Sequence, residues 1–383
     1  MPLRLPQIRL PQLNHKLAAP AAFAAVGAAA LISVQLFGDP DAAGPRRTIS
    51  LAPDAAEAAP RLSFGEAISE NGQMFGLDEL PSYYAGADSL DVGPEGELRV
   101  AVVESNTAGP GGGGSPLPRA PIAGLTEAGP NGLLPIVAQN GRTPAQAYAR
   151  PFTASERPAI AVVIGGLGFN ARATTQAIDE LPPEVTLSFV PYASDLQVWI
   201  DRARARGHEV MLELPMEPFD PEADDTGPQT LLASASSQQN TQRLLQLLSR
   251  GTGYFGVTNY QGARFATSAQ ASQPVVQELR RRGLAFVSSG IGQRTALSVE
   301  AQRAGLPTTA ADRIIDARRE ADAIDEQLLN LEALALQNRS AIGAGFAYPV
   351  TMEQVGRWAR DIESRGYQLA PASAVLNARA ARR

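Results

Sequence analysis

Residues 159–168, with the sequence AIAVVIGGLG, mark the point at which regular folded structure is expected to begin. The six apolar residues from Ala159 to Ile164 are typical of a strand that is buried on both faces of a parallel sheet. The glycine-rich turn after them resembles turns that approach a phosphate. Its spacing, however, matches neither the dinucleotide-binding nor the P-loop fingerprint. We therefore interpret the segment as the first strand of an α/β domain, ending in a tight turn.

Apolar runs and stretches of helical periodicity alternate from this strand to residue 369. The expected strands are 185–190, 209–214, 254–258, 284–287, 308–312, 341–345 and 367–369; the expected helices are 171–181, 196–206, 238–250, 270–282, 298–304, 322–338 and 352–365. Strict alternation predicts a parallel sheet. Seven or eight such units in about 220 residues favour a closed or nearly closed (β/α) barrel. An open doubly wound sheet is the alternative.

The start of the chain has the character of a membrane segment. Residues 17–37 read LAAPAAFAAVGAAALISVQLF and contain no charge, and about 20 apolar residues span a bilayer as a helix. Basic residues within 1–16 predict a cytoplasmic N-terminus and a signal anchor in the inner membrane. A cleaved signal peptide is the alternative, and it gives the same destination. Either way, the later domain is expected in the periplasm or another extracytoplasmic space.

Residues 38–157 show no sustained periodicity and are rich in Pro, Gly and Ala. They include GPGGGGSP at 109–116, which is a flexible-linker composition. We predict a largely disordered spacer here, followed by a folded domain at 158–376 and a short tail at 377–383. Short apolar pieces such as 98–103 could instead pair as strands or dock on the domain.

Composition excludes several function classes. The net charge of -6 argues against a nucleic-acid partner, which requires a basic surface. The absence of cysteine excludes disulfides, thiolate ligands and a cysteine nucleophile. Histidine, the commonest transition-metal ligand and general base, occurs only at His15 and His208. His208 is expected at a helix-to-strand turn, away from the strand ends, and we assign it a structural role.

Polar residues gather where the expected strands end, which is where sites form in parallel α/β folds. Two acids in ELPMEP at 213–218 could do acid–base work if their environments separate their pKa values. The segment NYQGAR at 259–264 offers hydrogen-bonding groups and one aromatic ring, the mixture that sugar binding uses. The candidate substrate-binding residues are Glu213, Glu217, Asn259, Tyr260, Arg264 and Asp312.

An ordered set of short motifs resembles the divergent polysaccharide deacetylase family from about residue 158 to 376. The motifs are LP at 181–182, VTLSF at 185–189, GHEV at 207–210, LPMEP at 214–218, GY and GV within 253–257, RGL at 282–284 and GYQLAP at 366–371. The resemblance implies a barrel that hydrolyses N-acetyl or O-acetyl groups on carbohydrate. It also implies an aspartate pair after the first strand and histidines at later strand ends. These would supply a base and hold a divalent metal such as zinc, which activates water.

This chain departs from the family pattern at the positions that carry the chemistry. Gly165 and Gly166 stand where the family pattern has two aspartates, and Ser288 and Ser289 stand where it has an aspartate–serine pair. Glu213, Tyr260 and the segment GFAYP at 345–349 stand where it has histidines. We therefore expect no catalytic residue, no metal ligand and no cofactor. The alternative is a divalent cation held through oxygen by Glu213, Glu217, Asp312 and Asp316.

These observations favour a non-catalytic envelope protein that keeps the barrel and binds a glycan or a protein partner. A second hypothesis is a working deacetylase with an unusual metal site. A third is a structural envelope protein whose barrel serves only as an interaction platform. Arg264 could also pair with Glu217 or Asp312, filling the vacated metal site without binding any ligand.

Overall fold

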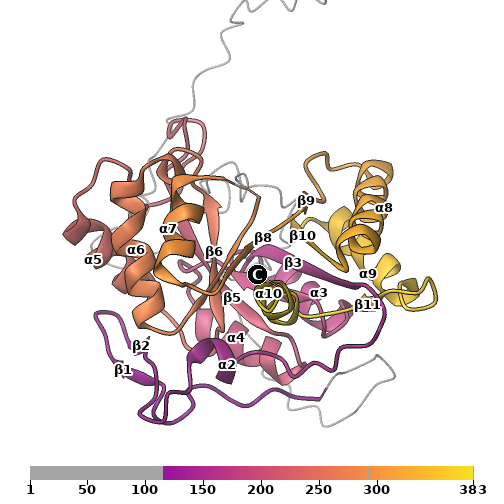
Figure 1. Cartoon of the computed structure of the whole chain (residues 1–383), viewed down its shortest axis with the longest axis horizontal. Helices are drawn as coiled ribbons and strands as arrows, with labels where there is room; N and C mark the ends of the chain where they lie inside the picture. Colours follow the sequence, from indigo (N-terminus) through magenta and orange to yellow (C-terminus); the bar gives the residue numbers. More distant parts are fainter. Residues whose placement is uncertain (1–114, 291–293, 383) are drawn as a thin grey trace, which may run out of the picture. The chain divides into compact units, whose positions relative to one another are not determined.

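The structure, a computed structural model, describes residues 115–290 and 294–382. Its centre is a parallel sheet in the order β8-β7-β6-β5-β4-β3-β10-β9, with β11 paired to β3 (Figure 1). The strands are β3 (Ala159–Leu167), β4 (Thr186–Phe189), β5 (Val210–Met216), β6 (Gly256–Gln261), β7 (Ala285–Ser288), β8 (Thr308–Ala310), β9 (Arg313–Ile314), β10 (Ser340–Phe346) and β11 (Gln368–Leu369). The predicted parallel sheet is therefore confirmed.

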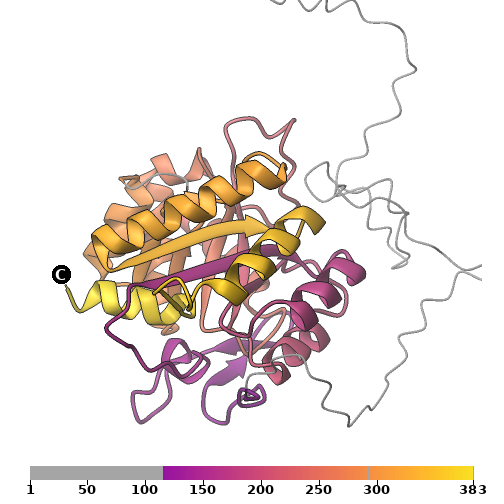
Figure 2. The ribbon, with the colours of Figure 1, turned by 90° about the vertical axis from the view of Figure 1, so that its right-hand side faces the viewer.

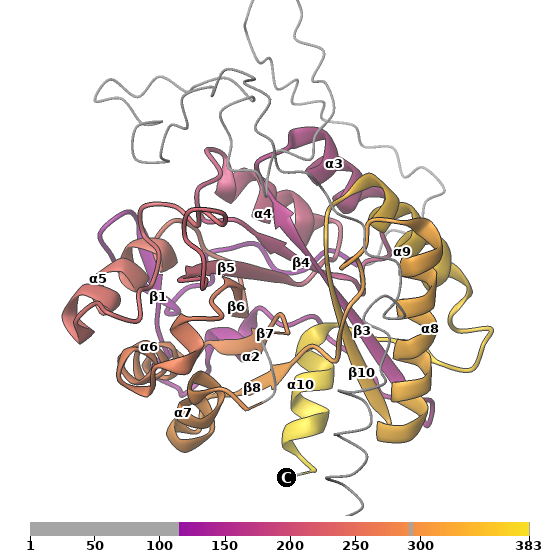
Figure 3. The same ribbon diagram turned by 90° about the horizontal axis from the view of Figure 1, so that it is seen from above.

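Helices surround this sheet, as Figure 3 shows from above. They are α3 (Ala171–Glu180), α4 (Leu196–Ala205), α5 (Ser237–Leu248), α6 (Ala269–Arg281), α7 (Ala296–Ala304), α8 (Ala321–Asn338), α9 (Pro349–Asp361) and α10 (Ala372–Ala380), with a 3₁₀ turn at η2 (Phe265–Thr267). Helix α8 runs along β10 (Figure 2). Several helices begin at a capping side chain; Asn170 and Ser236, for example, each accept a hydrogen bond from the third helical N–H.

One segment joins the two edges of the curled sheet. Strands β8 and β9 lie at opposite ends of the pairing order, yet both belong to residues 308–314. The N–H of Ala311 donates to the carbonyl of Ser288 at 2.8 Å, and the N–H of Asp312 donates to that of Ile342 at 2.7 Å. Residues 308–314 thus pair first with β7, through β8, and then with β10, through β9. This arrangement agrees with the predicted nearly closed barrel and not with an open doubly wound sheet.

Successive side chains of a strand point to opposite faces of the sheet. The sheet therefore has one apolar core on each face. On β3, Ile160 and Ile164 pack in the cluster that includes the helices, whereas Ala161 and Val163 belong to a second cluster. That second cluster also contains inward-facing residues of β5, β7 and β10, together with residues of α10 and of the segment before β3. The interior of the barrel is therefore filled with apolar side chains at the amino end of the strands.

The prediction of a disordered spacer is wrong for residues 115–157. This segment forms the antiparallel pair β1 (Thr126–Ala128) and β2 (Leu133–Pro135) and the short helix α2 (Pro144–Ala147). Tyr148 is buried, and the guanidinium of Arg204 donates to its carbonyl. Elements of three or four residues are too short to produce a periodic pattern in the sequence. The expected tail at 377–383 likewise continues α10 as far as Ala380.

The predicted anchor at 17–37 and the first part of the spacer, 38–114, lie outside the described residues. Within the ranges that the structure describes, no helix combines the length and the apolar character needed to cross a membrane.

Candidate functional site

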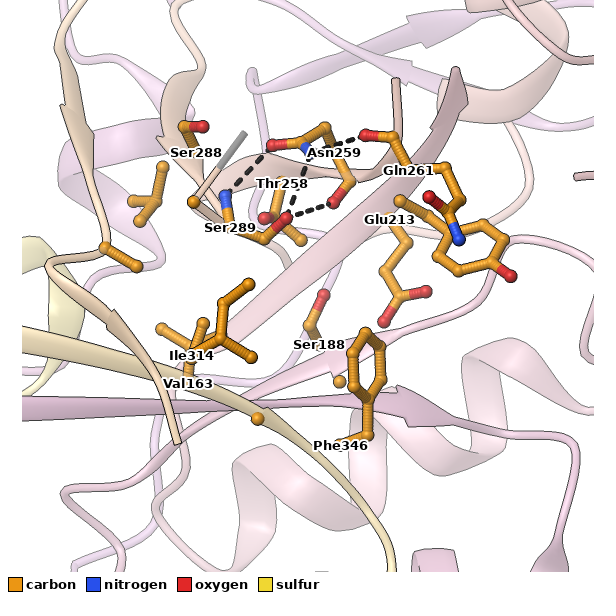
Figure 4. A pocket seen from close by; sticks show the side chains of 17 residues that line it. Val163, Ser188, Glu213, Thr258, Asn259, Gln261, Ser288, Ser289, Ile314 and Phe346 are labelled. Carbon is orange, nitrogen blue, oxygen red and sulfur yellow. Dashed lines mark hydrogen bonds between the residues drawn. The ribbon is translucent and has the colours of Figure 1, made fainter. Parts of the chain in front are cut away.

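A cavity of about 230 Å³ lies at the carboxyl ends of the strands (Figure 4). Described residues of seven strands line it, namely β3, β4, β5, β6, β7, β9 and β10, together with residues that follow β7 and β8. Apolar walls come from Val163, Val287, Ile314 and Phe346. This position agrees with the general placement of sites in parallel α/β folds.

Glu213 is the central polar group of this cavity. Its side chain is 2% exposed and projects from β5 (Figure 4). One carboxyl oxygen, Oε1, accepts a hydrogen bond from the N–H of Gly166 at 2.6 Å. The other, Oε2, has no hydrogen-bond partner among the described residues. Burial raises the pKa of Glu213 to about 7, and the Gly166 N–H only partly opposes that rise.

Gly165 and Glu213 occupy adjoining space. A Cβ atom placed on Gly165 would lie 2.6 Å from Oε1 of Glu213, closer than real contacts allow. The carboxyl group of Glu213 therefore fills the volume into which any side chain at position 165 would extend. Two of the departures from the family pattern, the glycine at 165 and the glutamate at 213, are thus sterically coupled.

Asn259 and Tyr260 also line the cavity, but they use their polar groups differently. The amide of Asn259 is committed: its Nδ2 donates to Ser289 Oγ at 2.9 Å, and its Oδ1 accepts from the Ser289 N–H at 2.9 Å. Nδ2 also donates to the carbonyl of Gln261, which has the left-handed φ of 54°. Asn259 therefore shapes the end of β6. Tyr260 is 3% exposed, and burial, reinforced by the nearby Glu213 charge, raises the pKa of its phenol.

The remaining three candidates lie outside the cavity lining. Oε2 of Glu217 accepts from the N–H of Ala233 at 2.6 Å, and its Oε1 lies 3.4 Å from Nε of the half-exposed Arg264. Asp312 pairs with Arg379 and accepts from a backbone N–H of β10. These groups fix loops and α10. The anticipated Arg264–Glu217 pair does form, but beside the cavity and not within it.

Sequence reasoning did not select two serines and an aromatic ring that line the cavity. The hydroxyls of Ser188 and Ser288 are buried and have no hydrogen-bond partner among the described residues. Ser188 and Phe346 lie beside Glu213 on one side of the cavity (Figure 4). The available signal for Ser188 was a second hydroxyl in the short run VTLSF, two residues after Thr186 and therefore on the same face of the strand.

The side chains present do not fit the divalent metal that the family pattern implies. A catalytic zinc site typically uses three protein ligands drawn from His, Asp, Glu or Cys. Residues 115–290 and 294–382 contain no group of three or more such side chains placed to hold a metal. Glu213 is the one carboxylate among the described lining residues. Asp316 is engaged elsewhere, accepting from the Phe346 N–H at 2.6 Å and from the Thr351 hydroxyl at 3.0 Å.

The GHEV motif lies at the opposite, amino end of the strands. Both ring nitrogens of the buried His208 contact backbone carbonyls, Nδ1 that of Val185 at 2.9 Å and Nε2 that of Ile178 at 3.1 Å. Burial lowers the pKa of His208, although the two carbonyls oppose that change. The prediction that His208 is structural is confirmed by these contacts.

Comparison with known proteins agrees with this architecture. A profile described as divergent polysaccharide deacetylase matches residues 162–376. The uncharacterized protein YibQ of Escherichia coli K12 is 26% identical over 226 residues, covering 57% of this chain and 67% of YibQ. The crystal structure of an uncharacterized protein, ATU2773, from Agrobacterium tumefaciens C58 is 35% identical, with a TM-score of 0.62 over 64% of this chain and 99% of that one. Since the profile covers more than half of the sequence, this chain belongs to the divergent polysaccharide deacetylase family.

Proposed function

We propose that this protein is a non-catalytic member of its family that binds a cell-envelope glycan in the cavity at the strand ends. The observation that carries the proposal is the content of that cavity. It is retained as a hollow, but Glu213 is the one acidic side chain among its described lining residues, and its carboxyl group lies against Gly165. A lone glutamate with no metal-ligand partners offers binding groups without the acid–base pair or metal that deacetylation uses.

The lining suits a sugar, which presents hydroxyl groups and an apolar C–H face. The buried hydroxyls of Ser188 and Ser288 have no hydrogen-bond partner within the described part of the chain, and Phe346 supplies an aromatic ring. A buried polar group without a hydrogen bond costs about 1–3 kcal/mol, so a ligand that bonds to these hydroxyls would offset that cost. The volume of about 230 Å³ is below the usual range for drug-sized ligands. We therefore propose that it accepts a group of about one sugar ring.

We also propose that residues 17–37 anchor the chain in the inner membrane and that the barrel lies on the extracytoplasmic side, where envelope glycans are found. The charge pattern around residues 1–37 supports this orientation. A reporter fused after Phe37 should be active outside the cytoplasm. Activity confined to the cytoplasm would contradict the orientation and remove the envelope glycan as a ligand.

Three measurements on the full-length protein test the function. We expect binding to at least one glycan on an array of envelope oligosaccharides. We also expect no acetate release from acetylated oligosaccharides, with or without added zinc, and no stoichiometric metal by elemental analysis. One tightly bound metal per chain together with acetate release would establish a working deacetylase instead. A blank array with no acetate release would leave the barrel as an interaction platform.

A further inference from the structure

The cavity has an uncompensated acidic character. Of its described lining residues, Glu213 is the one whose side chain can carry a full charge near neutral pH, because the others are apolar, hydroxyl, amide or phenol side chains. None of those lining residues is a lysine, an arginine or a histidine. Oε2 of Glu213 is buried, lacks a hydrogen-bond partner in the described structure and belongs to a group that lines the hollow.

Two other buried ionisable groups in the described structure, Arg282 and Glu332, have charged partners. The guanidinium of Arg282 pairs with Glu278 at 2.7 Å and also donates to the carbonyl of Pro135. Glu332 receives Arg365 at 2.7 Å and the indole N–H of Trp358 at 2.9 Å. A buried charge without a partner is costly, and proteins usually pair it or neutralise it. Oδ1 of Asp316 also lacks a hydrogen-bond partner among the described residues, but Asp316 does not line the cavity. Glu213 is therefore the buried acid to which a ligand in the cavity could supply a partner.

The surroundings of Glu213 suit a small cation with several N–H donors. A primary ammonium has three donors, and the acceptors beside one another here are Glu213 Oε2 and the hydroxyl of Ser188 (Figure 4). The ring of Phe346 lies next to the carboxyl group and gives this part of the cavity an apolar wall (Figure 4). An acetamido group is neutral and would leave the glutamate without a charge partner.

We propose that the recognised glycan carries a free, protonated primary amine, that is, an amino sugar without its N-acyl group, and that the Glu213 carboxylate binds this ammonium. The proposal rests on the function above, that the cavity binds a glycan, and it names the class of sugar. In this reading the glutamate at 213 gives the cavity selectivity for a deacylated sugar over its acylated precursor.

The test compares three probes on the full-length protein by calorimetry at neutral pH. They are an oligomer of glucosamine, the same oligomer fully N-acetylated, and cadaverine, which has primary amines but no sugar. We expect the glucosamine oligomer to bind at least about tenfold more tightly than either of the others, since a charge-assisted hydrogen bond contributes roughly that factor. E213Q keeps the shape of the side chain and removes the charge, so it should erase this preference.

E217Q provides the matched control, because Glu217 follows the same strand but lies outside the cavity lining. It should leave the preference unchanged. Equal binding of the acylated and free-amine oligomers, or an unchanged preference in E213Q, would overturn the ammonium proposal while leaving glycan binding intact. Cadaverine binding as tightly as the glucosamine oligomer would overturn the sugar assignment. Failure of both oligomers to bind would overturn this proposal and the proposed function together.

Discussion

Two glutamates four residues apart show how differently the two ends of this barrel are built. Glu209 immediately precedes β5 and Glu213 lies within it, so both share the inward face of the strand. Both are buried, and burial raises the pKa of each. Glu209 nevertheless accepts from the N–H groups of Arg150 and Ser373 at 3.0 and 3.1 Å and from two hydroxyls, those of Thr186 and Ser373. Glu213 accepts from one N–H.

This difference in hydrogen bonding suggests that Glu209 stabilises the fold and that Glu213 serves binding. Around Glu209, the start of α10, the segment before β3 and the strands meet, and Glu209 accepts a hydrogen bond from an N–H in the first turn of α10. Glu213 carries the same chemical group but lines a cavity, and its Oε2 has no hydrogen-bond partner among residues 115–290 and 294–382. Polar groups at the amino end of such barrels generally serve stability, whereas those at the carboxyl end serve ligands. The two glutamates follow that division within one strand.

The largest expected effect concerns the amino end of the barrel. A chain that begins at Ser155 would lack Leu125, Leu134 and Tyr148, all buried against the strands. Loss of a single large core side chain costs about 3–5 kcal/mol, and domains are stable by only about 5–15 kcal/mol. We expect this chain not to fold, whereas one beginning at Ser115 should melt cooperatively. Similar melting of both chains in circular dichroism would show that the barrel folds without residues 115–154.

The next effect concerns Glu209 itself. E209A leaves the buried N–H of Ser373 and the partly buried N–H of Arg150 without an acceptor, and it removes the hydrogen bonds that hold the start of α10. A buried donor left without an acceptor costs about 1–3 kcal/mol, and Glu209 accepts from several donors. Urea denaturation should show a loss of that size, with α10 exchanging its amide hydrogens faster. A loss below about 1 kcal/mol would mean that these bonds contribute little and that the contrast with Glu213 is only geometric.

The sequence predicted the carboxyl end less well than the fold as a whole. Most helices and strands from β3 to β11 follow periodic patterns, so the alternation of apolar runs and helical stretches identified them. The two-residue strand β9 and the terminal helix α10 were not predicted. The positions of Glu217 and Asp312 were not predictable, because each depends on a loop or helix, at Ala233 and Arg379, that meets it only in three dimensions. The relation between Gly165 and Glu213 was hidden for the same reason.

A moderate effect of pH should distinguish the two glutamates. In the folded state the pKa of Glu213 is raised from 4.5 to about 7, so the folded protein binds a proton that the unfolded chain releases between these values. The associated stability is fully present below about pH 4.5 and is lost as pH rises through 7, a change of roughly 3 kcal/mol at most. E213Q cannot titrate and should lack this loss.

The measurement is the difference between the wild-type and E213Q free energies of unfolding from pH 4.5 to 8, in which the titration of other groups cancels. Glu213 faces the phenol of Tyr260, which stays neutral in this range because burial raises its pKa, and the N–H of Gly166. We expect the variant to become relatively more stable as pH rises. If the difference in unfolding free energy does not change with pH, the pKa of Glu213 is not raised, and its carboxyl group is more hydrated or better hydrogen-bonded than its contacts indicate.

The smallest expected effect tests whether positions 165 and 213 share one volume. In G165A, the new Cβ would meet Oε1 of Glu213 at 2.6 Å, and overpacking of this kind typically costs about 1–3 kcal/mol. If Glu213 is first shortened in E213A, the same substitution at 165 should cost much less, because the space has been vacated. The double-mutant cycle should therefore give a coupling of about 1 kcal/mol or more.

E217A in place of E213A should give additive changes, since Glu217 does not approach Gly165. Additivity in both cycles would mean that the carboxyl group moves aside freely, and that glycine at 165 is not what allows a glutamate to occupy the carboxyl end of the barrel.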